Sequence, residues 1–338
     1  MLEMPAEALS SSGASTLTVN TALGSIIIPS DMLSTMNEIS GKTVCITIAA
    51  SDKSKLPEDV KAAIGNRPIL QLTLTLDGVE TAWNNPDAPV RVSIPYTPTA
   101  AEAESKESIV IWYIDKNDNI VTIPNGWYRQ TDGAVSFVIT HFSNFAVAFN
   151  KVEFRDVPDG VWYDRPVSFS AARGITAGTG KGNFSPNNRL TRGQFITMMM
   201  RAYGIEPDIG PEDNFSDAGD TWYTGYLAAA KRLGISAGVG NNMFAPEKAI
   251  TRQEMFTLLY NALKVINQLP KIKKSDEDKS VRTLSNFTDA GQISSWAREA
   301  MTLLLETGTV SGSGNRLFLK DTTTRAQMAQ VLYSLLSK

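Results

Sequence analysis

The chain has 338 residues, of which 42% are hydrophobic and 20% are charged, as in a globular protein of two or more domains. No stretch approaches the length of an apolar membrane-spanning helix, so we expect no membrane span. Residues 1–10 lack the basic start of a secretion signal, which fits either an excised fragment of a longer secreted protein or a cytosolic protein. The single cysteine, Cys45, excludes an internal disulfide and a cysteine-based zinc site, and its strand-like surroundings indicate a small buried residue.

Charge is distributed unevenly between the two parts of the chain. Residues 1–150 carry 9 basic and 16 acidic side chains, whereas residues 151–338 carry 23 basic and 19 acidic ones. The basic C-terminal part therefore fits an anionic partner. Because the excess is modest and no dense stripe of Lys and Arg is present, we do not expect nucleic acid to be that partner.

The N-terminal part has the pattern of a β-domain. Residues 1–20 are small and polar and predict a flexible lead-in. Alternating apolar residues between turn signals then predict an all-β, sandwich-like domain over residues 21–150. The expected strands are 43–48, 69–76, 79–83, 90–96, 109–114, 134–140 and 145–149, with one helix within 52–66. Segments 24–29, 89–96 and 141–147 resemble β-modules of bacterial surface proteins and, more loosely, ZU5-type domains.

Two features of this part resemble catalytic or metal sites. His141 is the only histidine and Ser143 follows it closely, but no acid stands where it would orient the imidazole, so a structural histidine is favoured. The segment 115–119 has the alternating oxygens of a calcium loop but lacks its glycine and distal glutamate, so a hairpin turn is favoured. We therefore expect no catalytic residue, no metal and no cofactor.

From Phe154 onward the sequence repeats three times. Each repeat opens with Phe-x-Asp, then has a Trp that begins a helical pattern, a glycine-rich turn and a second amphipathic helix. The spacing from the Asp to the Arg that begins the second helix is 36, 35 and 36 residues. The candidate residues are the aspartates Asp156, Asp217 and Asp289, the tryptophans Trp162, Trp222 and Trp296, and the turn glycines Gly174, Gly178, Gly234, Gly238, Gly308 and Gly312.

The second helix of each repeat begins with Thr-Arg-x-Glu/Gln, which predicts a capping box. Capping does not explain the arginine, because a cation at the first helical position is mildly disfavoured by the helix dipole. The same helix end presents free amides, so arginine and amides together predict an anion site at Arg192, Arg252 and Arg325. On this reasoning, replacing an arginine should weaken binding and hardly affect folding.

The three repeats differ in their details. Phe184-Ser185-Pro186 and Phe244-Ala245-Pro246 precede the first two capping boxes, and we align the degenerate Phe318-Leu319-Lys320 with them in the third repeat. Only repeat two keeps an acid in its box, Glu254, so we expect Arg252 to matter most for binding and Arg325 least.

These motifs together resemble the S-layer homology (SLH) motif, in three copies over residues 152–338. The resemblance implies a pseudo-threefold trimer of helix–loop–helix motifs. It also implies binding of a secondary cell-wall polysaccharide, often bearing a pyruvylated amino sugar, by proteins anchored to the envelope of Gram-positive bacteria. It makes the arginines the ligand residues and leaves the role of Glu254 open. The Trp side chains fit sugar stacking or the core equally well, and the Asp side chains fit a cap or ion pair better than a ligand contact.

The sequence therefore predicts a multidomain chain. A lead-in (1–20) and a β-sandwich-like domain (21–150) precede motifs at 151–210, 211–270 and 283–338, with a charged linker at 271–282. We interpret it as a non-catalytic, extracellular module that anchors a surface protein to a peptidoglycan-linked polymer. The alternatives are the anchoring part of a secreted enzyme, or an S-layer subunit whose β-domain makes lattice contacts with further copies.

Overall fold

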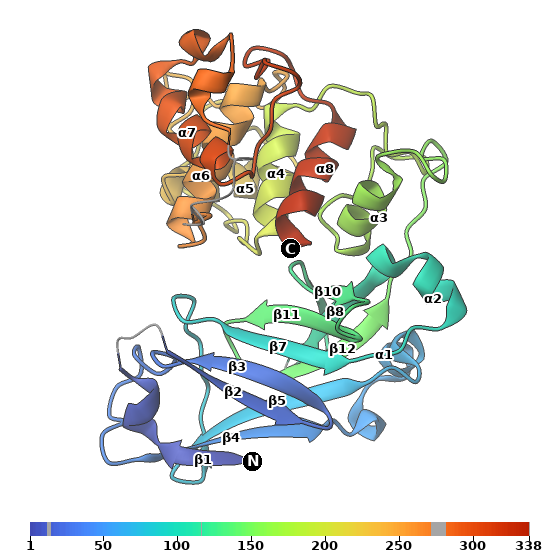
Figure 1. Ribbon diagram of the computed structural model, residues 1–338, viewed down its shortest axis with the longest axis vertical. Coiled ribbons are helices and arrows are strands. Elements are labelled where there is room, and N and C mark those ends of the chain that lie inside the picture. Colours follow the sequence, from blue (N-terminus) through green and yellow to red (C-terminus); the bar gives the residue numbers. More distant parts are fainter. Residues whose placement is uncertain (12–14, 116, 272–281, 338) are drawn as a thin grey trace. The chain divides into compact units, whose positions relative to one another are not determined.

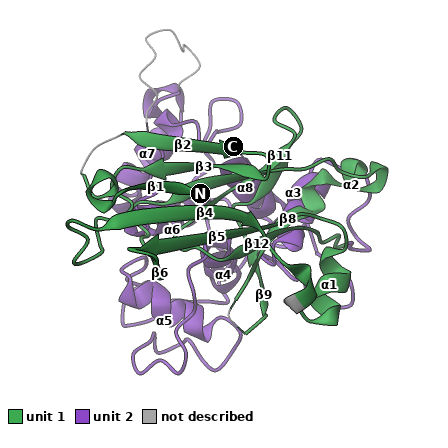
Figure 2. Ribbon diagram, turned by 90° about the horizontal axis from the view of Figure 1, so that it is seen from below, with its two compact units in different colours: residues 1–152 green, residues 153–338 purple. Residues whose placement is uncertain are grey.

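The computed structural model describes residues 1–11, 15–115, 117–271 and 282–337. The chain forms two compact units, residues 1–152 and 153–338, which are coloured separately in Figure 2. Ten of the twelve residues of the expected linker 271–282, namely 272–281, lie outside the described residues. No helix in the described ranges is both long and apolar enough to cross a membrane.

The N-terminal unit contains two antiparallel sheets. The first has the order β1-β4-β5-β12-β8-β9, with β6 paired to β5, and the second has the order β10-β11-β7-β3-β2 (Figure 1). The first sheet consists of β1 (Leu2–Pro5), β4 (Thr43–Ala50), β5 (Ile69–Leu76), β6 (Val79–Glu80), β8 (Ile109–Ile114), β9 (Ile120–Ile123) and β12 (Asn144–Phe149). The second consists of β2 (Thr16–Thr21), β3 (Gly24–Pro29), β7 (Val90–Pro95), β10 (Trp127–Arg129) and β11 (Ala134–Ile139).

The two sheets share one core, which makes this unit sandwich-like as the alternating pattern predicts. Val92 and Phe137 of the second sheet belong to the same buried cluster as Leu74 and Phe145 of the first. Alternate residues of β5 are buried, because successive side chains of a strand point to opposite faces. Burial of one face of each sheet therefore stabilises the pairing register.

Three expectations for this unit need correction. The described residues of the expected lead-in 1–20, which are 1–11 and 15–20, are ordered, because β1 pairs with β4, β2 pairs with β3, and a 3-10 turn (Ala6–Leu9) follows β1. The expected strand 79–83 is only the two residues of β6. The expected helix within 52–66 is a 3-10 turn (Lys53–Lys55) followed by α1 (Glu58–Ile64). A capped helix, α2 (Ala100–Glu104), and a 3-10 turn (Lys106–Ser108) complete the unit.

The C-terminal unit contains two helices from each repeat, as the periodicity predicts. They are α3 (Asp164–Ala172) and α4 (Arg192–Ala202), then α5 (Thr224–Arg232) and α6 (Arg252–Val265), then α7 (Arg298–Glu306) and α8 (Arg325–Leu336). The third repeat adds 3-10 turns at Leu284–Asn286, Ala290–Gln292 and Ser295–Ala297. The capping boxes are confirmed, since Thr191, Thr251 and Thr324 each accept a hydrogen bond from the third helical amide.

The helices pack between repeats rather than within them. The first helix of each repeat packs on the second helix of another: α5 on α4, α7 on α6, and α3 on α8 (Figure 1). Helix α4 also contacts α6 and α8. Short bridges at the helix starts follow the same order, joining Thr191 to Ala249, Thr251 to Thr322 and Arg189 to Thr324. The contacts therefore run from repeat one to two, two to three and three back to one.

Candidate functional site

The three repeat aspartates bind backbone amides of their own repeat. Asp156 accepts hydrogen bonds from the amides of Phe184 and Ser185, both at 2.7 Å. Asp217 accepts from Phe244 and Ala245 at 2.7 Å each, and Asp289 accepts from Leu317 and Phe318 at 2.8 and 2.9 Å. Burial alone would raise the pKa of Asp289, but these amides outweigh it and lower that pKa. The aspartates thus fix the loop before each second helix.

These contacts correct the alignment of the third repeat. Leu317, and not Phe318, occupies the position of Phe184 and Phe244, because its amide binds the repeat aspartate. Phe318 has the left-handed backbone (φ 56°) of Ala245 in repeat two. The residue at the proline position is therefore Leu319, whose carbonyl accepts a hydrogen bond from Gln253 as that of Pro246 does from Gly193.

Each box arginine donates Nε to a carbonyl of a different repeat. Arg192 donates to the Phe244 carbonyl at 2.8 Å, and Arg325 donates to the Phe184 carbonyl at 2.8 Å. Arg252 does the same to Leu317 at 2.9 Å. Arg192 and Arg325 are only 3% and 4% exposed. The expectation that these arginines contribute little to folding therefore needs revision, because they join the repeats.

The outer nitrogens of the guanidinium groups meet different partners. Arg192 Nη1 forms an ion pair with Glu254 at 3.2 Å. Arg325 contacts the neutral side chains of Thr176, at 3.2 Å, and Gln194, at 3.5 Å. Arg252 Nη2 donates to the carbonyl of Ser311 at 3.4 Å. Burial is the largest influence on all three arginines and lowers each pKa, while nearby carboxylates oppose it.

The three tryptophans lie on the surface and not in the core. Trp162, Trp222 and Trp296 are 59%, 57% and 54% exposed, although large aromatic side chains are mostly buried in proteins. Trp162 and Trp222 each lie edge-on to the tyrosine that follows in the sequence. Each indole therefore offers an apolar face to a ligand.

One cavity, the first groove, collects residues of all three repeats. Its volume is about 450 Å³, within the usual range for small-ligand sites. Loop 175–179 and helix α4 of repeat one line it together with Trp222 of repeat two and Arg325 of repeat three. The α4 side chains are Gln194, Thr197, Met198 and Arg201.

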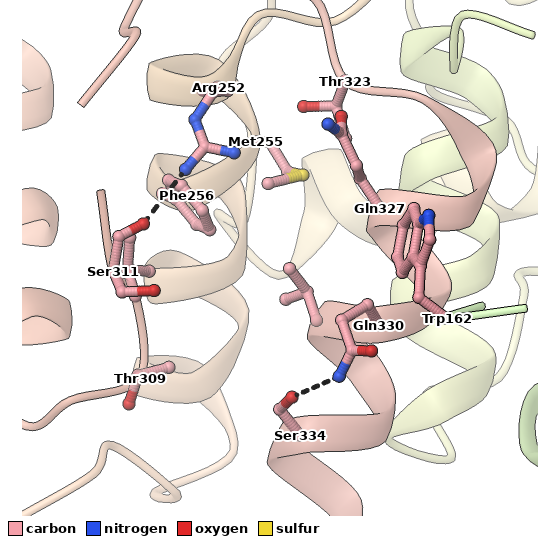
Figure 3. Close-up of a pocket in the computed structure, with 12 residues that line it drawn as sticks. Trp162, Arg252, Met255, Phe256, Thr309, Ser311, Thr323, Gln327, Gln330 and Ser334 are labelled. Carbon is pink, nitrogen blue, oxygen red and sulfur yellow. Dashed lines mark hydrogen bonds between the residues drawn. The ribbon is translucent and has the colours of Figure 1, made fainter. Parts of the chain in front are cut away.

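A second cavity, the third groove, has the same construction and a volume of about 210 Å³. Loop 309–311 and helix α8 of repeat three line it, with Trp162 of repeat one and Arg252 of repeat two. Figure 3 shows Arg252 and Trp162 on opposite sides of this cavity, with Gln327 between them.

The turn glycines have two structural roles. Gly174, Gly234 and Gly308 follow the first helices with positive φ values of 65–72°, which only glycine adopts readily. At Gly178, Gly238 and Gly312 an added Cβ would collide with a backbone carbonyl and with the ring of Phe154, Phe215 or Phe287, respectively. These contacts shape the loops that line the grooves, so the glycines act through the backbone.

Four groove residues escaped the sequence prediction: Gln194, Thr197, Arg201 and Thr323. Arg201 lies nine residues after Arg192, where the other repeats have Asn261 and Ser334. The hydroxyls of Thr197 and Thr323 are buried without a partner among the described residues, and both residues line a cavity. Arg201 could have been identified from the sequence, because it lies on the same helical face as Gln194.

The two features of the N-terminal unit that resemble catalytic or metal sites have local partners. The His141 ring packs edge-on against Tyr113, with centroids 4.8 Å apart, and burial lowers its pKa. Ser143 donates to the Ile114 carbonyl at 3.0 Å. Asp115 accepts from the amides of Asn117 and Asn119, both at 2.8 Å, as in a hairpin turn. Among the described residues there is no cluster of three or more His, Cys, Asp or Glu side chains suited to a metal.

Residues 153–196, 214–256 and 286–329 match the S-layer homology domain family. The C-terminal unit consists of three S-layer homology domains. The chain is 31% identical over 182 residues to the S-layer protein sap of Bacillus anthracis, a match that covers 53% of this chain and 20% of that protein. These matches identify a cell-surface, cell-wall-associated protein.

Two enzymes are also similar to the chain. The amylopullulanase of Thermoanaerobacterium thermosulfurigenes is 30% identical over 253 residues, covering 74% of this chain and 13% of the enzyme. Exoglucanase XynX of Acetivibrio thermocellus is 27% identical over 241 residues, covering 70% of this chain and 20% of the enzyme. The chain thus spans a fifth or less of the length of these three relatives.

Proposed function

We propose that the SLH unit anchors a larger protein non-covalently to the cell wall by binding an anionic secondary cell-wall polysaccharide. The observation that carries this proposal is the first groove, in which an exposed Trp222 and the cation Arg325 face one cavity. A pyruvylated amino sugar fits this chemistry, because a guanidinium binds a carboxylate with charge-assisted hydrogen bonds and an indole packs against a sugar ring.

We further propose that the three motifs form a pseudo-threefold trimer. The support is the repeated set of contacts in which each arginine binds the loop of another repeat and each first helix packs on another repeat's second helix. In such an arrangement every groove takes residues from all three motifs, as the two cavities do.

The proposal is tested by sedimenting the full chain with cell-wall sacculi before and after extraction of the secondary polymer. We expect sedimentation with intact sacculi, its loss after extraction, and competition by the released polymer. Equal binding to extracted sacculi would instead indicate recognition of peptidoglycan itself and would contradict the proposal.

One observation favours the anchoring part of a glycan-degrading enzyme over an S-layer lattice subunit. The matches to the two enzymes cover 74% and 70% of the chain, more than the SLH unit, and so extend into the β-unit. The match to the sap protein covers 53%. On this second proposal the β-unit is a module adjoining catalytic domains elsewhere in the protein.

We propose that the β-unit is itself non-catalytic, because Ser143 donates its hydroxyl to a carbonyl and His141 packs among aromatic rings. Hydrolysis of polysaccharide and ester substrates is the test, with wild type and His141→Ala compared. Neither should exceed the buffer blank. Activity in the wild type that disappears in the variant would overturn this assignment.

A further inference from the structure

Strand β2 is the last strand of the second sheet in the N-terminal unit. Among the described strands it pairs with β3 alone, so its other side is a free edge (Figure 2). Thr16, Thr18 and Asn20 are exposed, whereas Leu17 and Val19 are partly buried against the shared core. A free edge presents backbone donors and acceptors to which a further strand can pair.

The backbone groups that β2 leaves free belong to alternate residues. The Ser30 amide donates to the Ser15 carbonyl at 3.0 Å, and the next pair along the ladder joins Thr16 to Pro29, which has no amide. Hydrogen-bonded and non-hydrogen-bonded pairs alternate along an antiparallel ladder. The described residues of β2 whose amides and carbonyls point away from β3 are therefore Thr16, Thr18 and Asn20.

The other strands that end a sheet are protected in ways that β2 is not. Strands β1, β9 and β10 have only four, four and three residues, and β1 contains Glu3 and Pro5. Strand β2 has six residues and contains neither a charge nor a proline. Short length, charge and proline are the usual features that prevent edge strands from pairing. Among the described end strands, β2 is therefore the one best suited to pair with another chain.

The charge distribution favours a second copy of this chain as the partner. Residues 1–150 carry 9 basic and 16 acidic side chains, yet no charged residue occurs between Ala8 and Ser30, a stretch that includes both β2 and β3. Two copies of this acidic unit can therefore meet at β2 without placing like charges opposite each other. A two-fold axis at such an edge pairs the strand with itself in the antiparallel direction.

We propose that two copies of this chain pair through β2, antiparallel, in the register that places Thr18 opposite Thr18 of the other copy. Leu17 then lies opposite Val19 on the core side, and Thr16 lies opposite Asn20 on the exposed side. A shift by one residue would place core-facing side chains opposite exposed ones. The chosen register also brings together all three residues with free backbone groups, so the two units share one continuous sheet.

Oxidative cross-linking of the full chain tests this register. All variants carry Cys45→Ser, so that the introduced cysteine is the sole thiol. Thr18→Cys should give a disulfide-linked dimer, because the Cα atoms of a directly opposite hydrogen-bonded pair lie about 5.5 Å apart, within the disulfide range.

Asn20→Cys is the matched control, because Asn20 is exposed on the same face of the same strand. In the proposed register its two copies are four residues apart along the strands, roughly 14 Å, and should not cross-link. Equal cross-linking of the two variants would indicate random collision and would overturn the proposal. A dimer formed by Asn20→Cys and not by Thr18→Cys would overturn the register.

Sedimentation velocity over a range of protein concentrations measures the affinity. The wild type should dimerise, and Thr18→Lys should weaken the association severalfold, because it places two ammonium groups opposite each other. Thr97→Lys, which changes an exposed threonine away from β2, should dimerise like the wild type. A wild type that stays monomeric, or a Thr18→Lys variant that dimerises normally, would overturn the proposal. The inference concerns the N-terminal unit alone and does not depend on the proposed function.

Discussion

The carboxylate of Asp217 and the guanidinium of Arg192 bind the same residue from opposite ends of its backbone. Asp217 accepts from the Phe244 amide at 2.7 Å, and Arg192 donates to the Phe244 carbonyl at 2.8 Å. Asp217 belongs to the same repeat as Phe244, whereas Arg192 belongs to repeat one. The backbone of Phe244 is therefore held both by its own repeat and by a neighbouring repeat. The same pair of contacts occurs at Phe184 and Leu317.

The two hydrogen bonds that Asp217 accepts predict a large effect of Asp217→Ala on stability. The substitution removes the acceptor of two amides, and each hydrogen bond to a charged group contributes roughly 1.5–3 kcal/mol. We expect the free energy of unfolding of the SLH unit to fall by about 2–4 kcal/mol in urea denaturation. Asp220→Ala, on an exposed residue in the same loop, should change it little. Equal denaturation curves for both variants would show that the hydrogen bonds of Asp217 do not contribute to the free energy of unfolding.

The contact between repeats predicts that Arg325→Ala both unfolds more easily and binds less polymer. Its Nε hydrogen bond and its buried packing against Phe184 are lost, at a cost of about 2–3 kcal/mol. Thermal melts and sacculus binding at a temperature well below the melting transition separate the two effects. The control is Arg232→Ala, which removes an exposed partner of Asp208. A variant that melts like the wild type would restore the original view that the arginine serves only the ligand.

The exposed tryptophans predict loss of binding without loss of stability. Trp222→Ala removes a ring that is 57% exposed and lines the first groove, so polymer affinity should fall severalfold while the melting temperature hardly changes. Ile209→Ala is the control, because Ile209 is an exposed apolar residue that lines neither cavity. Wild-type affinity in Trp222→Ala would show that this ring does not contact the polymer.

The β-unit has a buried acid that predicts its behaviour at low pH. Burial would raise the pKa of Glu102, but hydrogen bonds from Thr99, Tyr96 and Arg67 outweigh it and lower the pKa from 4.5 to about 2. A lowered folded-state pKa gives stability that is present above pH 4.5 and lost as the pH falls toward 2. The contribution is on the order of 3 kcal/mol, since one pKa unit corresponds to 1.36 kcal/mol.

Urea denaturation of the β-unit signal between pH 6 and pH 2 measures this dependence. Glu102→Gln should be less stable at pH 6 and should lose less stability on acidification. Glu104→Gln changes the exposed acid of the same helix and should keep the wild-type slope. Parallel slopes for Glu102→Gln and the wild type would assign the acid sensitivity to other groups.

Much of the fold follows from local sequence patterns. Strand β5 ends where the Asp77-Gly78 turn predicts, and the three capping boxes begin α4, α6 and α8 at the expected residues. Strand β1 escaped prediction because its four residues are ordered by a distant partner, Thr43–Ile46 of β4. Nonlocal pairing of this kind leaves no mark on the segment itself.

The site was predictable in composition but not in assembly. The arginines, tryptophans and glycines could be identified from the repeat, but Arg192 Nε binds a backbone carbonyl, a group that every residue possesses. The sequence alignment of the third repeat was shifted by one residue. It matched Phe318 to Phe184 and Phe244 because all three are aromatic, whereas Leu317 occupies that position in the structure. Which repeat contributes the Trp and which the Arg to a groove depends on packing between helices, and no single repeat encodes it.

The pairing of α3 with α8 has a consequence for biosynthesis. The first helix of the SLH unit, α3, packs on its last helix, α8. The hydrogen bond from Arg325 to Phe184 likewise spans 141 residues. During translation, α3 emerges long before its partner exists, and closing so long a loop is entropically slow. Within the SLH unit, α8 is thus translated last and completes the packing of α3. Truncation before α8 should leave the apolar face of α3 exposed to aggregation and proteolysis.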